Sequence, residues 1–199
     1  MDRDLRARLD RIRARLARLR ELDPPQPEGS NLIDRDGKRL DGYIMFGAAS
    51  HAYRHWLIDE EHLRTLESAM GCTLPAEFRA FLSEIGVGAG PYYGIDWEYL
   101  RRGATAKCAE PFPEGDSGPY YLDEDGDEEV ESGYLEITQM GCGDDVGLVV
   151  TGPARGRVVW VLRTNDVWEL GPPFLDYYEQ WIERGIGRLE AGERPFQIV

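Results

Sequence analysis

The first 22 residues carry their apolar side chains in one narrow stripe. The members of the stripe follow one another at alternating spacings of four and three residues, at Leu5, Leu9, Ile12, Leu16 and Leu19. Nearly all other positions are charged or alanine, so the segment predicts an amphipathic helix with the seam of a coiled coil. Because so thin a stripe stabilises a lone helix little, we expect the helix to pair with a second copy, or to lie against its own domain or a partner.

A linker is predicted directly after this helix. Residues 23–31 read DPPQPEGSN, which combines three prolines and a glycine with polar side chains. The sequence therefore predicts three parts, namely a helix over residues 1–22, a linker over 23–31 and a domain over 32–199.

Two further helices are predicted early in the domain. One runs from Asp59, a suitable N-cap, to Gly71, and the other starts at Pro75 and ends at Gly86. The second helix repeats apolar residues at the spacing of a core-facing stripe, at Phe78, Phe81, Leu82 and Ile85.

Short segments rich in valine and tryptophan follow in the second half of the chain. The segments YLEIT, GLVVT, RVVWVLRT and VWEL are separated by short polar breaks, which predicts an antiparallel meander. The segment FLDYYEQWIERG then closes the domain as an amphipathic helix. Helices followed by strands and a last helix predict an α+β fold.

Composition and charge narrow the class of protein. Of 199 residues, 42% are hydrophobic and 30% are charged, which is typical of a globular protein, and we expect it to be cytoplasmic, without membrane contact. Residues 1–22 hold eight arginines against four acids, so the formal net charge of −14 leaves about −18 on the rest of the chain. Such a body repels phosphate backbones and attracts basic proteins, so we expect no direct nucleic-acid partner.

The candidate catalytic and metal-binding motifs are weak. Ser117 lies in GDSGP, which has the letters of a trypsin-like nucleophile loop without the β-barrels that place a triad. The acidic run 123–131 has its glycine too early for a calcium loop. The three cysteines, at 72, 108 and 142, form no CxxC pair, and His51 and His55 fit a structural role better than a metal site. We expect neither a cofactor nor a metal.

The stretch GCGDDVGLVVTGPARGRVVW, residues 141–160, is rich in glycine and contains the adjacent Asp144 and Asp145. Phosphate loops place such glycines before a helix, whereas here they precede and separate strands. Glycine at these places supplies positive φ or a bulge, so the stretch predicts the turns of a sheet.

Four blocks of the sequence, taken together, resemble the SUKH superfamily. They read FGAASHAYRHW, LPAEFRAFLSEIGVGAGPYYG, YLEITQMGCG and LVVTGPARGRVVWV, and the resemblance runs from about Phe46 to Trp181. It is closest to the bacterial branch related to the fungal cell-wall-synthesis regulators. The matching positions are Leu74, Pro75, Phe78, Arg79, Phe81, Leu82, Gly86, Gly90, Pro91, Tyr93, Gly94, Gly141, Cys142, Gly143, Gly152, Arg155, Gly156 and Trp160.

The resemblance implies helices packed around a mixed or mainly antiparallel sheet, with the first helix as an addition. It also implies a binding module without catalytic residues, because many bacterial members are immunity proteins that neutralise polymorphic toxins, often nucleases. The fungal relatives act as regulatory scaffolds.

Three hypotheses follow for function. The first is an immunity protein whose acidic surface caps a basic toxin domain. The partner-binding residues that we predict for it are Asp123, Glu124, Asp125, Asp127, Glu128, Glu129, Asp144 and Asp145. The second is an adaptor that forms a homo-oligomer through residues 1–22, and the third is a hydrolase that uses Ser117 or the carboxylates.

Overall fold

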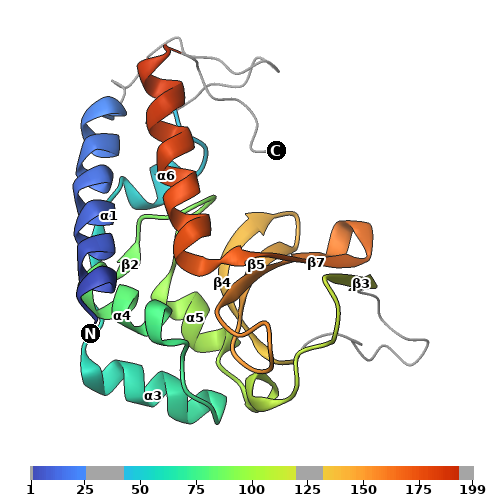
Figure 1. Ribbon diagram of the computed structural model, residues 1–199. Helices are drawn as coiled ribbons and strands as arrows, with labels where there is room; N and C mark the ends of the chain where they lie inside the picture. The colour runs from blue at the N-terminus through green and yellow to red at the C-terminus, as the bar shows by residue number, and fades with distance from the viewer. Residues whose placement is uncertain (1, 26–42, 120–131, 193–199) are drawn as a thin grey trace.

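The computed structural model describes residues 2–25, 43–119 and 132–192 of the chain. Helices gather on one side of the molecule, and a curled sheet extends from them on the other (Figure 1). Five strands form this sheet in the antiparallel order β3–β7–β6–β5–β4, and the described part also holds a two-stranded pair, β1–β2. The α+β prediction is confirmed.

The helix predicted at the N-terminus is present and lies against its own domain. α1 (Arg3–Leu22) starts at the N-cap Asp2 and buries Leu9, Ile12, Leu16 and Leu19, each at most 1% exposed. It runs beside α6 (Phe174–Glu190), and its leucines belong to the main hydrophobic core (Figure 1). Most of the apolar stripe that could join two copies is therefore covered within one chain.

Ion pairs fix the direction of α1 along α6. Residues with increasing numbers on the two helices meet in order, in the pairs Arg8 with Asp176 and Glu179, Arg15 with Glu183, and Arg18 with Glu190. The two helices are thus parallel. These pairs neutralise some of the basic residues of α1 with acidic residues of α6 in the same chain.

The two helices predicted between residues 59 and 86 are confirmed as α3 (Glu60–Met70) and α4 (Ala76–Glu84). Asp59 caps α3 by accepting the His62 N–H, and Gly71 ends it in the left-handed conformation. The remaining short helical elements are α2 (Ala48–His51), α5 (Trp97–Gly103), η1 (Ala106–Ala109) and η2 (Arg163–Asn165).

The predicted meander is also confirmed. Consecutive strands pair as antiparallel neighbours from β4 to β7, and β3 adds itself beyond β7. The strands of the large sheet are β3 (Ser117–Pro119), β4 (Tyr134–Gly141), β5 (Asp144–Val149), β6 (Arg157–Leu162) and β7 (Val167–Pro173). Those of the small pair are β1 (His55–Trp56) and β2 (Val87–Gly88).

The two faces of the large sheet line separate apolar cores. Side chains alternate along each strand, so Val146, Leu148 and Val158 join the helices in the main core. Val159 and Val161 point to the other face, where a smaller core forms around Trp168.

A buried carboxylate joins α1 to the segment before β1. Asp23 is 0% exposed and accepts hydrogen bonds from Ile44 N–H (2.8 Å), Met45 N–H (3.0 Å) and the Tyr53 hydroxyl (2.7 Å). Asp23 was expected to begin the linker, and it instead belongs to the packed domain. Residues 26–31 of that linker lie outside the described residues. No helix in the described parts of the chain is both long and apolar enough to cross a bilayer.

Candidate partner-binding surface

Helix α6 covers only part of the sheet face on its side. Trp160 marks the border, because its ring contacts Tyr177 of α6 at a centroid distance of 6.2 Å. Glu169 of β7 lies opposite Trp160 of β6 in the ladder, on the same face of the sheet. Side chains alternate along each strand, so Leu162 of β6 and Asp144 of β5 also lie on this face. Their side chains are half-buried or exposed, so this part of the sheet faces outward.

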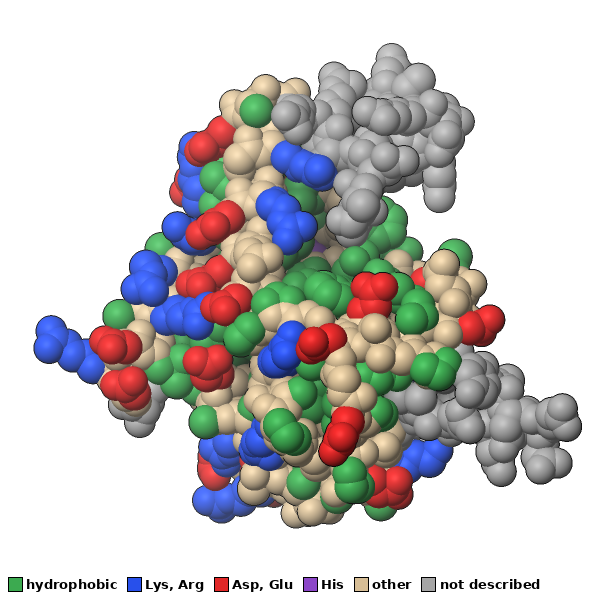
Figure 2. Space-filling model, turned by 45° about the vertical axis from the view of Figure 1, so that its right-hand side comes forward, with side chains coloured by type: hydrophobic (Ala, Val, Ile, Leu, Met, Phe, Trp, Pro, Cys, Tyr) green, Lys and Arg blue, Asp and Glu red, His purple; other side chains and the backbone are tan. Residues whose placement is uncertain are grey.

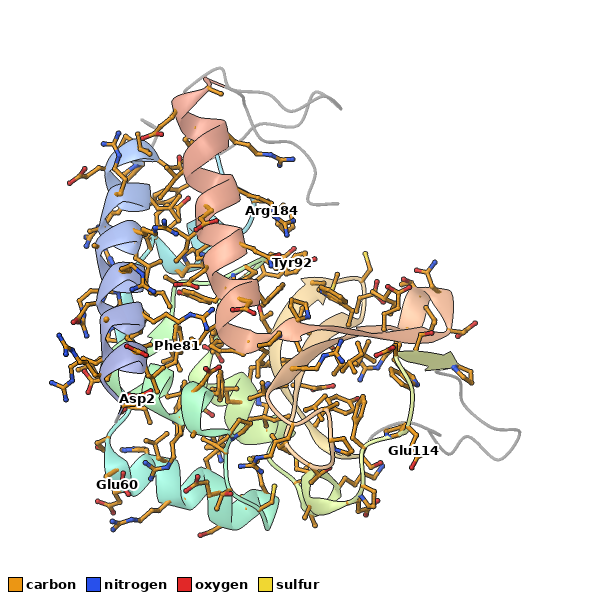
Figure 3. The ribbon with its side chains drawn as sticks, viewed as in Figure 1. Asp2, Glu60, Phe81, Tyr92, Glu114 and Arg184 are labelled. Carbon is orange, nitrogen blue, oxygen red and sulfur yellow. The ribbon has the colours of Figure 1, made fainter. Side chains whose placement is uncertain are left out.

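The wall of α6 and this open sheet face meet at a corner. Figure 2 shows a hollow there, in which apolar side chains gather with a few charged ones around them. From α6, Trp181 and Arg184 follow Tyr177 on one helix face, and Figure 3 shows Arg184 and Tyr92 pointing to this side. We call this region the corner surface, and it consists of Phe46, Tyr92, Tyr93, Met140, Asp144, Trp160, Leu162, Glu169, Trp181 and Arg184.

Two exposed aromatic side chains close one end of the corner surface. Phe46 and Tyr93 are each 44% exposed, and their rings contact each other at 5.4 Å. Tyr93 also lies beside Gly141 of the β4–β5 turn. A contiguous aromatic surface beside charged groups is typical of a protein-binding site.

Strained backbone occurs at the same place. Tyr92 and Cys142 adopt positive φ values of 53° and 56°, which disfavour residues with a side chain. Such conformations persist where the surrounding structure holds them, and they cluster at binding sites. The loop that carries Tyr92 is held by Thr138, whose hydroxyl donates to the Gly94 carbonyl at 2.6 Å.

The polar groups of the corner surface affect one another. Burial raises the pKa of Tyr92, with Arg184 acting against this shift and Asp144 adding to it. Burial also raises the pKa of Tyr177 well above its usual value, and its hydroxyl has no hydrogen-bond partner among the described residues. Both phenols stay protonated at neutral pH, as an unshifted tyrosine also does. The Tyr177 hydroxyl is buried, so it is not open to a partner in this conformation.

The glycine-rich stretch forms turns, as predicted. Gly141 and Gly143 have φ values of 104° and 91° in the β4–β5 turn, and Gly152 and Gly156 have positive φ between β5 and β6. The side chain of Arg155 donates to the Leu74 carbonyl (2.8 Å) and the Val150 carbonyl (2.7 Å), so this motif residue ties the turn to the start of α4.

Asp144 and Asp145 have different surroundings. Asp145 is only 6% exposed and is bound by the Tyr99 hydroxyl and by Arg163, which also pairs with Glu136. Asp145 was expected to face a partner, and its carboxylate is instead engaged inside the domain because alternation turns it to the other sheet face. Asp144 accepts from the Thr164 N–H (2.9 Å) and hydroxyl (2.8 Å) and remains at the surface.

Other candidate residues from the sequence do not meet at this surface. Ser117 is exposed in β3 and pairs with Glu169 in the ladder. The predicted partner-binding residues Asp123, Glu124, Asp125, Asp127, Glu128 and Glu129 lie outside the described residues. Among the described residues, no group of three or more histidine, cysteine, aspartate and glutamate side chains is placed to hold a metal ion.

His51 is a buried histidine with polar and aromatic neighbours. It is 5% exposed, accepts the Tyr53 N–H at 3.0 Å through Nδ1, and contacts the ring of Trp181 at 6.3 Å. Burial lowers its pKa from 6.5 to about 4, and a contact with the Gly90 backbone offsets part of the shift.

This pKa predicts a pH-dependent stability. Between pH 6.5 and about 4 the unfolded chain binds a proton at His51 that the folded chain does not. The free energy of unfolding is therefore expected to decrease as the pH is lowered through this window. The full effect is about 3 kcal/mol. Urea unfolding of the wild type and of His51→Gln at several pH values measures it, and the variant should lose this part of the slope. Equal slopes in both proteins would contradict the prediction.

Several residues of the corner surface were not predicted from the sequence. Phe46, Tyr92, Glu169 and Arg184 come from four separate segments, and only the fold brings them together. The one local signal was PYYG, where two aromatic residues stand between turn-forming residues.

The fold defines an α+β domain, and the corner surface beside α6 gathers exposed aromatic and charged side chains. The comparison with protein families agrees with this architecture. The chain belongs to the SMI1 / KNR4 family (SUKH-1), whose model matches residues 57–180. Neither a curated protein nor a solved structure matches the chain. The match begins after α1 and ends within α6, so the first helix lies outside the part shared with the family.

Proposed function

We propose that this protein is a non-enzymatic immunity protein that neutralises a basic toxin domain by binding it at the corner surface. The observation that carries the proposal is the open half of the sheet face beside α6, with exposed aromatic side chains at its end. Membership of the SMI1 / KNR4 family supports a binding role.

The aromatic residues would supply most of the binding energy. Phe46 and Tyr93 already contact each other, so little rotamer freedom is lost when a partner covers them. Buried aromatic anchors are the commonest residues whose loss costs an interface more than 2 kcal/mol.

The acids would select a basic partner. Asp144 and Glu169 lie on the floor of the corner surface, and the chain has a formal net charge of −14. The acidic run 123–129 carries the same sign of charge and stays part of the proposal. A charge of this size speeds the encounter with a basic protein, and the effect weakens with salt.

The test starts from co-purification of the tagged protein from its host, with the salt concentration raised in steps. One basic toxin domain that elutes at a defined step is then used for binding kinetics. Asp144→Lys with Glu169→Lys is expected to slow association at least tenfold, and Tyr93→Ala is expected to speed dissociation by about 30-fold.

Glu114→Lys is the matched control, because Glu114 is exposed and lies away from Tyr92 and Arg184 (Figure 3). An affinity that is the same at low and high salt would contradict the electrostatic part of the proposal. Unchanged binding by Tyr93→Ala would contradict the choice of surface. The oligomerising adaptor receives no comparable support, since its seam is covered by α6.

A further inference from the structure

One row of residues crosses the large sheet from the covered part of its face to the open part. Its members lie opposite one another on neighbouring strands, at Val146, Trp160, Glu169 and Ser117. Residues paired in this way have their side chains on the same face of the sheet. Val146 is buried, Trp160 is half-buried, and Glu169 and Ser117 are exposed. The cover that α6 provides therefore ends at the Trp160 ring, and an acid stands directly beside that ring.

The Trp160 ring lies on β7, over Gly171. A Cβ atom added to Gly171 would come within 2.8 Å of Cη2 and 2.9 Å of Cζ3 of the ring, so a residue with a side chain does not fit beneath it. From the side, the ring of Tyr177 meets the indole at 6.2 Å and an angle of 77°. The sheet and α6 thus fix the plane of the indole, and the part of the ring that stays exposed faces away from the sheet.

The carboxylate of Glu169 is not neutralised by its surroundings. It forms neither an ion pair nor a side-chain hydrogen bond within residues 2–25, 43–119 and 132–192. Asp144, the other acid on the floor of the corner surface, lies near Arg184, because both act on the pKa of Tyr92 in opposite directions. Part of the field of Asp144 is therefore offset by Arg184, and Glu169 is the acid that a cation of a partner meets with its full charge.

A flat ring with a carboxylate at its edge is complementary to the guanidinium group of arginine. The guanidinium is planar, so it stacks on an indole, and its N–H donors point outward in the same plane. A carboxylate beside the ring then accepts two parallel hydrogen bonds from the stacked group. A lysine ammonium is a compact point charge without such a plane, so it cannot make both contacts in this geometry.

We infer that Trp160 and Glu169 form an arginine subsite of the corner surface, in which an arginine side chain of the partner stacks on the indole and pairs with the carboxylate. The inference rests on the proposed function, because it takes the corner surface as the docking site and names the side chain that the basic partner contributes. The net charge of −14 attracts any basic protein, whereas the arginine subsite distinguishes arginine from lysine at one point. Trp160 is then a specificity-determining residue as well as the border of the core.

The test follows the indole N–H signals of the full chain by NMR at constant ionic strength. The chain has five tryptophans, and Trp160→Phe identifies the signal of Trp160. The probe is the peptide acetyl-Gly-Arg-Gly-amide, titrated to about 50 mM, and its relatives carry lysine or uncharged citrulline in place of arginine. The arginine peptide is expected to shift the Trp160 signal selectively, the lysine peptide to bind about threefold more weakly or less, and the citrulline peptide to give no saturable shift.

Variants complete the test. Glu169→Gln keeps the shape of the side chain and removes its charge, so it is expected to weaken binding of the arginine peptide about fivefold or more. Glu61→Gln makes the same change at an exposed acid of α3, which lies away from β6 and β7 (Figure 1), and should change the affinity less than about twofold. Both positions are exposed, and thermal melts show whether each variant is folded.

Several results would overturn the inference. These are no selective shift of the Trp160 signal, equal binding of the arginine and lysine peptides, or equal losses with Glu169→Gln and Glu61→Gln. A concentration-dependent dimer that Glu169→Gln abolishes would assign the arginine subsite to a second copy instead. The peptide test is independent of the toxin, so its failure leaves the salt and Tyr93→Ala tests of the proposed function in force. A corner surface that fails those tests leaves the peptide result to be judged by itself.

Discussion

Replacement of Ile12 and Leu16 by alanine is expected to destabilise the protein by about 5 kcal/mol. Both side chains are at most 1% exposed in the core between α1 and α6, so their truncation leaves cavities that the packed helices cannot close. A loss of this size approaches the whole stability of many domains. Urea unfolding measured by circular dichroism gives the free energy directly.

Ala17→Ser is the control for this double variant, because Ala17 is exposed on the same helix and its replacement should cost less than about 0.5 kcal/mol. A loss below about 1 kcal/mol in the double variant would mean that α1 is not packed on its own domain in solution. Sedimentation would then show whether α1 joins two copies.

Replacement of Asp23 by alanine is expected to cost about 4 kcal/mol and to lower the melting temperature by about 10 °C. The carboxylate accepts from Ile44, Met45 and Tyr53, and without it three donors are left in a site that water does not reach. Burial and the nearby Asp23 raise the pKa of Tyr53, so the phenol keeps its proton at neutral pH and needs an acceptor.

Two further variants distinguish this network from a general effect of charge. Tyr53→Phe removes one donor and keeps the ring, so it should cost about 1–2 kcal/mol. Asp10→Ala removes an exposed carboxylate of α1 and should cost less than about 1 kcal/mol. If Asp23→Ala were no more harmful than Asp10→Ala, the network would not hold α1 to the segment before β1.

Much of the fold could be predicted because the deciding forces are local in the sequence. Asp59, Gly71 and Pro75 mark helix ends through their own backbone preferences, and the valine-rich segments form strands in the order in which they occur. The position of α1 could not be predicted in this way. Its stripe suits a second copy and an intramolecular partner equally, and the choice depends on α6, more than 150 residues away.

The candidate site was less predictable than the fold. Asp144 and Asp145 are adjacent in the sequence, yet strand alternation sends one to the surface and the other to Tyr99 and Arg163. A pair of adjacent acids therefore does not predict an acidic surface unless the strand register is known. Phe46 and Tyr93 carry no functional signal of their own and become a site through their contact.

The parallel pairing of α1 and α6 has a consequence for how the domain is inherited. The arginines of α1 meet the acids of α6 in one register, and the last turns of α6 lie beyond the part shared with the family. A change of charge on either helix is then tolerated best when the other helix changes with it. Arginines of α1 and acids of α6 are therefore expected to change together in evolution, because each helix balances the charge of the other.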